Sequence, residues 1–208
     1  RLSDFCLSDF CPSDTMGCCS TSKSAVAQMS EAMRLDEVRG PIESPAYWYG
    51  RDLQAEDCWI ETLSSVETDE VQRAVEQVHS RDVSMLEMRR EDFPLPTLGK
   101  RLHGLARKLD RGRGFWLLRG LPVEALGERS AAFAYWGIGL HLGQPVSQNA
   151  RGHLLGHVTD EGVEFRKHSG ARGYQTRLQL PYHTDSSDVV GLLCLQPAKS
   201  GGLSSVAS

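Results

Sequence analysis

The 208-residue sequence is 40% hydrophobic and 24% charged, a balance typical of an ordinary globular domain and unlike that of collagen, a coiled coil or a wholly disordered chain. Its 23 Lys and Arg residues against 27 Asp and Glu residues give a formal net charge of -4, so we expect no nucleic-acid partner. The longest nearly unbroken apolar run, residues 189–195, is about a third of the roughly 20 residues that a bilayer-spanning helix needs, so we expect no transmembrane segment.

The N-terminal segment is rich in Ser, Asp and Cys and lacks a regular apolar period. We therefore predict that residues 1–44 form a leader without regular structure. An alternative concerns residues 16–21 (MGCCST), which would match a myristoylation signal with adjacent cysteines if Met16 were the start of the protein. A lipid-anchored form therefore stays open as a second interpretation of this segment.

Four of the six cysteines lie in this leader, and their spacing differs from the paired pattern of zinc sites. No signal-peptide pattern precedes them, so we expect reduced thiols and a cytoplasmic protein. The four are Cys6, Cys11, Cys18 and Cys19.

Three helices are predicted after an aromatic cluster at residues 45–50, where order should begin. The first starts at Thr68, a suitable N-cap residue that acidic residues and then an apolar face follow. The second starts at Thr97 and ends at a pair of glycines, before a buried strand at residues 115–118. The third covers residues 130–142 and ends at a Gly-Gln-Pro sequence.

Short strand-like pieces follow the helices, which predicts an α+β fold whose later part is an antiparallel sandwich or barrel. These strands are too few to bury both faces of such a structure. We therefore expect the domain, over residues 45–208, to be incomplete and truncated at its C-terminus. The expected strands cover residues 153–158, 163–166, 174–180, 189–195 and 203–207.

The residues that point most directly to chemistry are His183 and Asp185, which stand two positions apart in the run LPYHTDSSD. On an extended segment, side chains at i and i+2 project to the same face. An imidazole and a carboxylate presented in this way can occupy adjacent sites of one metal ion, and a second histidine would complete the set that binds Fe(II) with open positions. Alone, an H-x-D tripeptide arises by chance in many chains, and His183 could equally be a hydrogen-bonded core residue.

Beyond this pair, residues 112–208 resemble the TauD/TfdA branch of the Fe(II)- and 2-oxoglutarate-dependent dioxygenases, especially fungal members. The resemblance implies a helical N-terminal part followed by a double-stranded β-helix, the jelly roll of clavaminate synthase-like proteins. It also implies Fe(II), 2-oxoglutarate and dioxygen as cofactor and co-substrates. The motifs that carry it are GFWLLRGLP at residues 114–122, LGQP at 142–145, HTD at 183–185 and KSGGLSS at 199–205.

The resemblance assigns roles to individual residues. His183 and Asp185 would be two of the three iron ligands and hence the catalytic residues, and Ser204 stands where the family has a hydroxyl that binds 2-oxoglutarate. The family's second iron histidine and its 2-oxoglutarate-binding arginine lie far downstream of this motif, whereas no His or Arg follows Asp185 here. The upstream His153 and His157, which flank a predicted strand, are the histidines that could be drawn toward the site.

Substrate contacts are predicted in two places. Tyr182 stands directly beside the first ligand, and a polar tripeptide follows the third helix. A polar turn without substrate contact is the alternative for the tripeptide. Its residues are Ser147, Gln148 and Asn149.

Taken together, the sequence predicts an oxidoreductase, a dioxygenase that hydroxylates a small organic metabolite. The alternative is a non-catalytic binding or interaction protein derived from the same fold, which the missing distal histidine favours. A zinc hydrolase is a further alternative, although the sequence has no H-E-x-x-H helix to supply its general base. The sequence leaves open whether the protein is a homo-oligomer.

Overall fold

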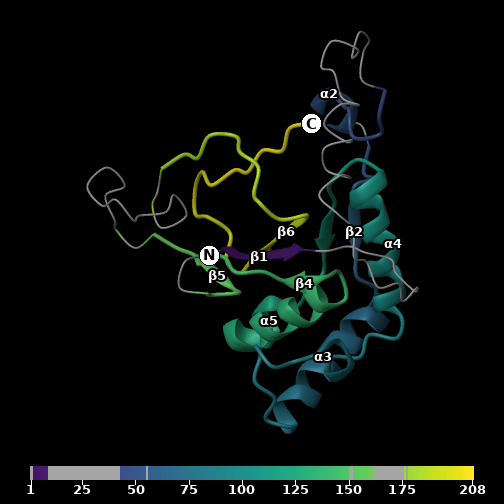
Figure 1. The fold of residues 1–208 in the computed structure, drawn as a ribbon, viewed down its shortest axis with the longest axis vertical. Helices are drawn as coiled ribbons and strands as arrows, with labels where there is room; N and C mark the ends of the chain where they lie inside the picture. Colours follow the sequence, from purple (N-terminus) through teal and green to yellow (C-terminus); the bar gives the residue numbers. More distant parts are fainter. Residues whose placement is uncertain are drawn as a thin grey trace, which may run out of the picture.

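The computed structural model describes residues 2–8, 43–54, 56–149, 152–160, 162, 176 and 178–208. Helices form most of residues 43–140, and the described residues after them are mostly irregular, with short strands among them (Figure 1), so the predicted α+β class is confirmed. The elements are β1 (Leu2–Ser8), α2 (Gly50–Gln54), β2 (Ile60–Thr62), α3 (Ser65–Ser80), the short 3-10 helix η2 (Arg90–Asp92), α4 (Leu98–Arg111), β3 (Leu117–Arg119), α5 (Val123–Leu140), β4 (Gln144–Pro145), β5 (Gly156–Val158) and β6 (Val189–Cys194).

Helix α3 begins earlier than predicted because its N-cap is Ser64, not Thr68. The backbone N–H of Glu67 donates to Ser64 Oγ at 3.3 Å, and the backbone N–H of Ser64 donates to Glu67 Oε2 at 2.8 Å. This reciprocal pair is a capping box, which satisfies two backbone donors at the helix start. The prediction of a helix was therefore right, and its first residue was wrong.

Helix α4 begins after Thr97 as predicted, but another side chain caps it. The Thr97 hydroxyl makes no capping bond. Instead, the buried carboxylate of Glu70, from α3, accepts hydrogen bonds from the backbone N–H groups of Thr97 and Leu98 at 3.0 Å each. A negative charge at this position also complements the positive end of the helix dipole. The start of α4 is thereby fixed to α3.

Helix α5 is longer than the predicted helix over residues 130–142. It covers Val123–Leu140 and contains a break at Gly127, whose φ of +72° is readily adopted only by glycine. The residues after this break correspond to the predicted helix. Among the described residues, no helix is both long and apolar enough to cross a membrane.

The hydrophobic core lies where α3, α4 and α5 meet. Trp136 of α5 and Phe93, which follows η2, are at most 1% exposed, and Gly137 lies against the ring of Phe93. The apolar stripe predicted for α4 is buried in this core. The completely or almost completely buried side chains are Trp136, Phe93, Leu98, Leu102, Leu105, Val71 and Val78.

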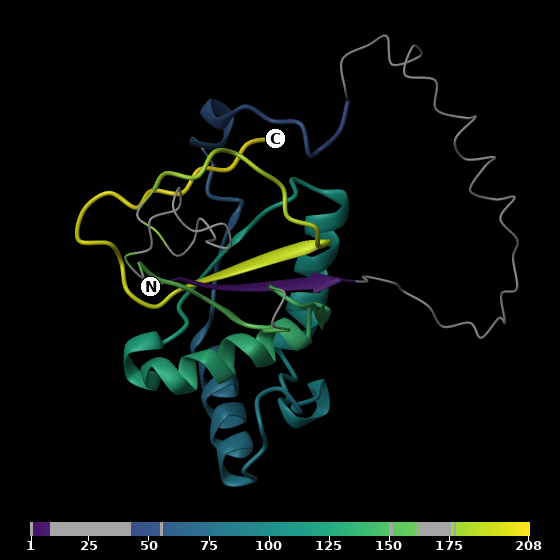
Figure 2. The ribbon, with the colours of Figure 1, turned by 60° about the vertical axis from the view of Figure 1, so that its left-hand side comes forward.

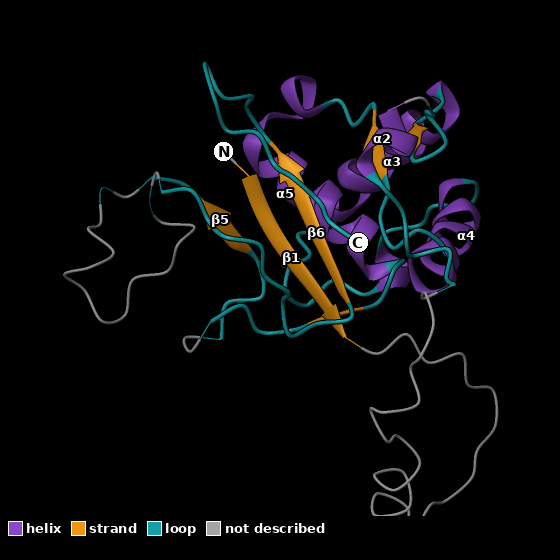
Figure 3. Cartoon of the chain, turned by 90° about the horizontal axis from the view of Figure 1, so that it is seen from above, coloured by secondary structure: helices purple, strands orange, loops and turns teal. Residues whose placement is uncertain are grey.

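Strand β1 is the centre of a four-stranded antiparallel sheet. It pairs along its length with β6, from Leu2 opposite Cys194 to Leu7 opposite Val189, and with β5 and β4 on its other edge. Strands β1 and β6 lie side by side (Figure 3), and α5 runs beneath them (Figure 2). The expected strand at 189–195 and the antiparallel pairing are thus confirmed.

Other strand predictions differ from the structure. Composition predicts no regular structure over residues 1–44, yet β1 lies within that range, because its backbone pairs with a strand at the far end of the chain. The strand predicted at 115–118 as buried is β3, which pairs in parallel with β2 and has Leu117 and Arg119 exposed and only Leu118 half-buried. No strand forms at 203–207 or in the described part of 174–180, and β5 covers only the end of 153–158.

Some predictions fall outside the described residues. These include the strand expected at 163–166, the segment at 16–21 and the side chains of the leader cysteines. The described strands do not close into a double-stranded β-helix, so that part of the fold stays a prediction.

Candidate functional site

The predicted ligand pair lies on the irregular segment that leads into β6. His183 and Asp185 are both exposed, and the segment reaches β6 four residues after Asp185. Because β6 pairs with β1, the C-terminal side of this segment is attached to the sheet by a ladder of backbone pairs. The sequence folds in this way because the polar run around the motif gives way to the apolar residues of β6.

One hydrogen bond fixes the chemistry of the His183 ring. Its Nδ1 lies 2.8 Å from the carbonyl oxygen of Pro181, two residues earlier. A carbonyl oxygen can only accept, so Nδ1 carries the proton and donates it. The neutral ring then has its lone pair on Nε2, which is the atom available to a metal ion. Metal-binding histidines are commonly oriented by such a bond from the other ring nitrogen.

The carboxylate of Asp185 is exposed and has no hydrogen bond or ion pair with a described residue. It therefore keeps both oxygens available as ligands. No group of three His, Cys, Asp or Glu side chains that could hold a metal ion occurs in the described part of the chain. His183 and Asp185 thus supply one imidazole nitrogen and a carboxylate, which suit Fe(II) chemically, without a third described ligand beside them.

The two upstream histidines are not drawn to this pair within the described ranges. The Nδ1 of His153 lies 3.2 Å from the side-chain nitrogen of Asn149. His157 is an exposed residue of β5. The structure therefore gives no support to either residue as the third ligand.

Ser147, Gln148 and Asn149 lie in an irregular stretch after β4 and make local hydrogen bonds. The Ser147 hydroxyl donates to the carbonyl oxygen of Asn149 at 2.8 Å, and the Gln148 side-chain amide donates to that of Val146 at 3.0 Å. These bonds correspond to the polar-turn alternative for the tripeptide. A substrate that bound here would have to compete with them.

The remaining predicted site residues are exposed. Tyr182 is 73% exposed, and Ser204 lies in the irregular segment that follows β6. Gly201 and Gly202, which precede Ser204, have φ values of +70° and +68°, a backbone shape that favours glycine. The chain then returns to α2 (Figure 1), where the hydroxyl of Ser208 donates to the Trp48 carbonyl oxygen at 3.0 Å.

Comparison with known proteins identifies the family to which the chain belongs. Residues 79–208 match the family described as "Taurine catabolism dioxygenase TauD, TfdA family". This match covers more than half of the chain, and the chain therefore belongs to the TauD/TfdA family of dioxygenases. The family match also begins well before residue 112, where the resemblance was first placed, and it includes α4 and α5.

Two curated relatives cover most of the chain. One is "FR-33289 synthase" of Streptomyces rubellomurinus, 31% identical over 171 residues, which are 82% of this chain and 50% of the relative. The other is "Taurine hydroxylase-like protein SAT17" of Stachybotrys chartarum, 28% identical over 178 residues, which are 83% of this chain and 46% of the relative. The chain therefore spans about half the length of the curated relatives that it matches.

Sequence reasoning missed a second group of polar residues, on the helices. Two buried carboxylates of α3, Glu67 and Glu70, bind α4 at different points, and a half-buried histidine, His141, ends α5. The burial of the two carboxylates could have been predicted from the sequence, because their helical spacing places both on the face that carries Val71 and Ala74. The histidine had no comparable signal.

Proposed function

We propose that this chain carries part of the metal site of an Fe(II)- and 2-oxoglutarate-dependent dioxygenase that hydroxylates a small organic metabolite. His183 and Asp185 are two of the metal ligands, and Ser204 contributes its hydroxyl to the binding of 2-oxoglutarate. Membership of the TauD/TfdA family supports the class of reaction. The observation that carries the ligand assignment is the bond between His183 Nδ1 and the Pro181 carbonyl, which frees Nε2.

In this proposal each side chain has a separate task. The Pro181 carbonyl selects the His183 tautomer and restrains the direction of its ring. The Asp185 carboxylate offsets part of the metal's charge. Bound between them, Fe(II) with 2-oxoglutarate and dioxygen would supply the oxidant that attacks a C–H bond of the substrate.

Of the substrate candidates, Tyr182 is the strongest. It adjoins His183 in the sequence and is 73% exposed, so its ring is accessible to a ligand. The polar groups of Ser147, Gln148 and Asn149 are already engaged in local hydrogen bonds, which makes these three weaker candidates.

The ligand assignment is tested by adding Fe(II) and then 2-oxoglutarate to the 208-residue chain under anaerobic conditions. We expect the weak visible charge-transfer band that forms when a metal and 2-oxoglutarate bind together. His183→Gln and Asp185→Asn should each abolish the band. The matched controls are His157→Gln, on β5, and Asp188→Asn, three residues beyond Asp185, and both should retain it.

A band that survives both ligand substitutions would refute the assignment of His183 and Asp185. We expect the band because two protein ligands and 2-oxoglutarate can hold the metal together; its absence in the unaltered chain would refute that expectation.

A further inference from the structure

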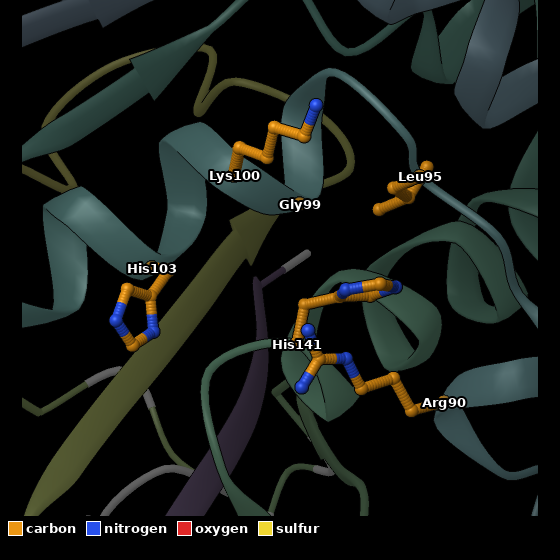
Figure 4. Close-up of a pocket in the computed structure, with 6 residues that line it drawn as sticks. All are labelled: Arg90, Leu95, Gly99, Lys100, His103 and His141. Atoms are coloured by element: carbon orange, nitrogen blue, oxygen red, sulfur yellow. The ribbon is translucent and has the colours of Figure 1, made fainter. Parts of the chain in front are cut away.

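A second site of different chemistry lies on the helices. A pocket of about 330 Å³ opens between η2, the first half of α4 and the end of α5. None of its lining residues belongs to the predicted metal or substrate set. The residues that line it are Arg90, Leu95, Gly99, Lys100, His103 and His141 (Figure 4).

The pocket is lined by basic side chains and by no acidic one. Neither Arg90 nor Lys100 forms an ion pair with any residue that the structure describes. Arg101, the next residue on α4, contrasts with them because it binds Glu61 at 2.6 Å and Glu67 at 2.8 Å. The chain as a whole has more acidic than basic residues, so an excess of unpaired cations in one pocket needs a local explanation.

The His141 ring adds a polar atom that is both buried and unpartnered. Its Nε2 lies 2.8 Å from the Phe93 carbonyl oxygen and must donate to it, which leaves the lone pair on Nδ1. That Nδ1 is buried and has no hydrogen-bond partner among the described residues. A neutral ring therefore presents an unsatisfied acceptor, whereas a protonated ring would present a donor.

Gly99 and Arg90 lie next to the His141 ring. A Cβ added to Gly99 would lie 3.0 Å from His141 Nδ1. The absence of a side chain at Gly99 therefore leaves room for the His141 ring, and both residues line the pocket. The guanidinium group of Arg90 lies alongside the same ring (Figure 4). Burial and, to a lesser degree, the charge of Arg90 hold the pKa of His141 below its ordinary value, although the Phe93 carbonyl and Glu91 act in the other direction. An anion bound beside Arg90 would offset the Arg90 charge and favour the protonated ring, whose Nδ1 is a donor.

We propose that this pocket binds a small oxyanion, a phosphate or a carboxylate, with Arg90 as its principal ligand and Lys100 and His103 at its sides. A guanidinium group presents a planar set of donors that matches two oxygens of such an anion. His103 and Lys100 both line the pocket, but they project from α4 in different directions, and the Lys100 side chain as drawn points away from Arg90 and His141 (Figure 4), so Lys100 would have to turn to approach the anion.

The backbone N–H groups at the N-terminus of α4 are not available to bind the proposed anion. The backbone N–H groups of Thr97 and Leu98 already donate to Glu70, and that of Gly99 donates to the Leu95 carbonyl at 2.8 Å. Side chains must therefore supply the attraction.

The test is a calorimetric titration of the 208-residue chain with inorganic phosphate and, separately, with succinate, at low ionic strength and without Fe(II) or 2-oxoglutarate. We expect saturable binding of at least one of the two, and the tighter one identifies the class of anion. Arg90→Gln should weaken that binding about tenfold, since a hydrogen bond to a charged group is lost. Lys100→Gln should weaken it less, because its ammonium group is a flexible point charge.

The matched control is Arg107→Gln, which removes the same charge from an exposed position of α4 that does not line the pocket. It should leave the affinity unchanged, and the ring resonances of His141 should shift on titration in the unaltered chain. The proposal is overturned if neither anion saturates, if Arg107→Gln weakens binding as much as Arg90→Gln, or if the His141 resonances do not move. Because no metal or 2-oxoglutarate is present, these outcomes are independent of the ligand assignment for His183 and Asp185.

Discussion

The buried carboxylate of Glu70 should be one of the most important polar groups for stability, because it caps a helix to which it does not belong. It is 4% exposed and accepts from the backbone N–H groups of Thr97 and Leu98. Glu70→Ala would leave both donors without this partner, and the bond from Leu98 is completely buried.

The cost of this change follows from two known effects. Loss of an N-cap costs about 1 kcal/mol. A buried backbone donor left unsatisfied costs roughly 1–3 kcal/mol. Water can still reach Thr97, which is exposed, so we expect Glu70→Ala to lower the free energy of unfolding by about 2 kcal/mol. Glu70→Gln keeps one acceptor oxygen and should cost about half as much.

The matched control is Glu76→Ala, which removes an exposed carboxylate from the same helix. Urea unfolding curves give the free energy of unfolding for all three variants. If Glu70→Ala and Glu76→Ala destabilise the protein equally, the capping role is refuted.

The pH dependence provides an independent test of Glu70. Burial raises the pKa of its carboxyl, but hydrogen bonds from Thr97 and Leu98 outweigh burial and hold the pKa below its ordinary value of 4.5. Folding therefore favours the charged form, and this stabilisation is complete above pH 4.5. It is lost as the pH falls from there through the lower pKa of the folded state. The loss should be smaller in Glu70→Gln, and an identical acid profile would contradict this account.

Two further changes test the packing and the charges around α4. Gly137→Ala would place a methyl group on the buried ring of Phe93 and should cost roughly 1–3 kcal/mol, measured by urea unfolding. Gly104→Ala, on α4 with no atom near the added group, should instead stabilise the protein by roughly 0.5–1 kcal/mol. Arg101→Gln leaves the buried Glu67 carboxylate without its cation and should cost about 2 kcal/mol in the same assay. Lys108→Gln removes an exposed partner of Glu61 and should cost less than about 1 kcal/mol; equal losses in these two variants would contradict the difference in burial.

The parts of the fold that the sequence predicts well are those with local causes. Helix α4 has an apolar stripe, a start at Thr97 and glycines at its end, all within one short stretch, and both of its ends are where they were predicted. The start of α3 is also encoded locally, since Ser64 and Glu67 have capping-box spacing, although the acidic residues after Thr68 favour that residue as the N-cap. Gly127 explains the missed first part of α5, because its left-handed backbone interrupts the helical pattern.

The parts that could not be predicted depend on residues far apart in the sequence. Strand β1 has no apolar period of its own strong enough to suggest order, and its partner β6 stands at the other end of the chain. The cap of α4 by Glu70 joins two helices in the same way. For the candidate site, the spacing of His183 and Asp185 predicts a ligand pair, whereas the Pro181 bond that selects the His183 tautomer became visible only in the structure.

The segment that carries His183 and Asp185 is less buried than the helices. The helices bury their apolar faces against one another, but β6 exposes Val190 at 42% and Leu192 at 53%, and residues 178–186, which include His183 and Asp185, are exposed where they are described. That segment is therefore held to the described structure by the backbone pairing of β6 with β1 and by Val189, which packs against the hydrophobic core. Because both ligands are themselves exposed, opening of the ladder and of the Val189 contact would displace them without unfolding the helices.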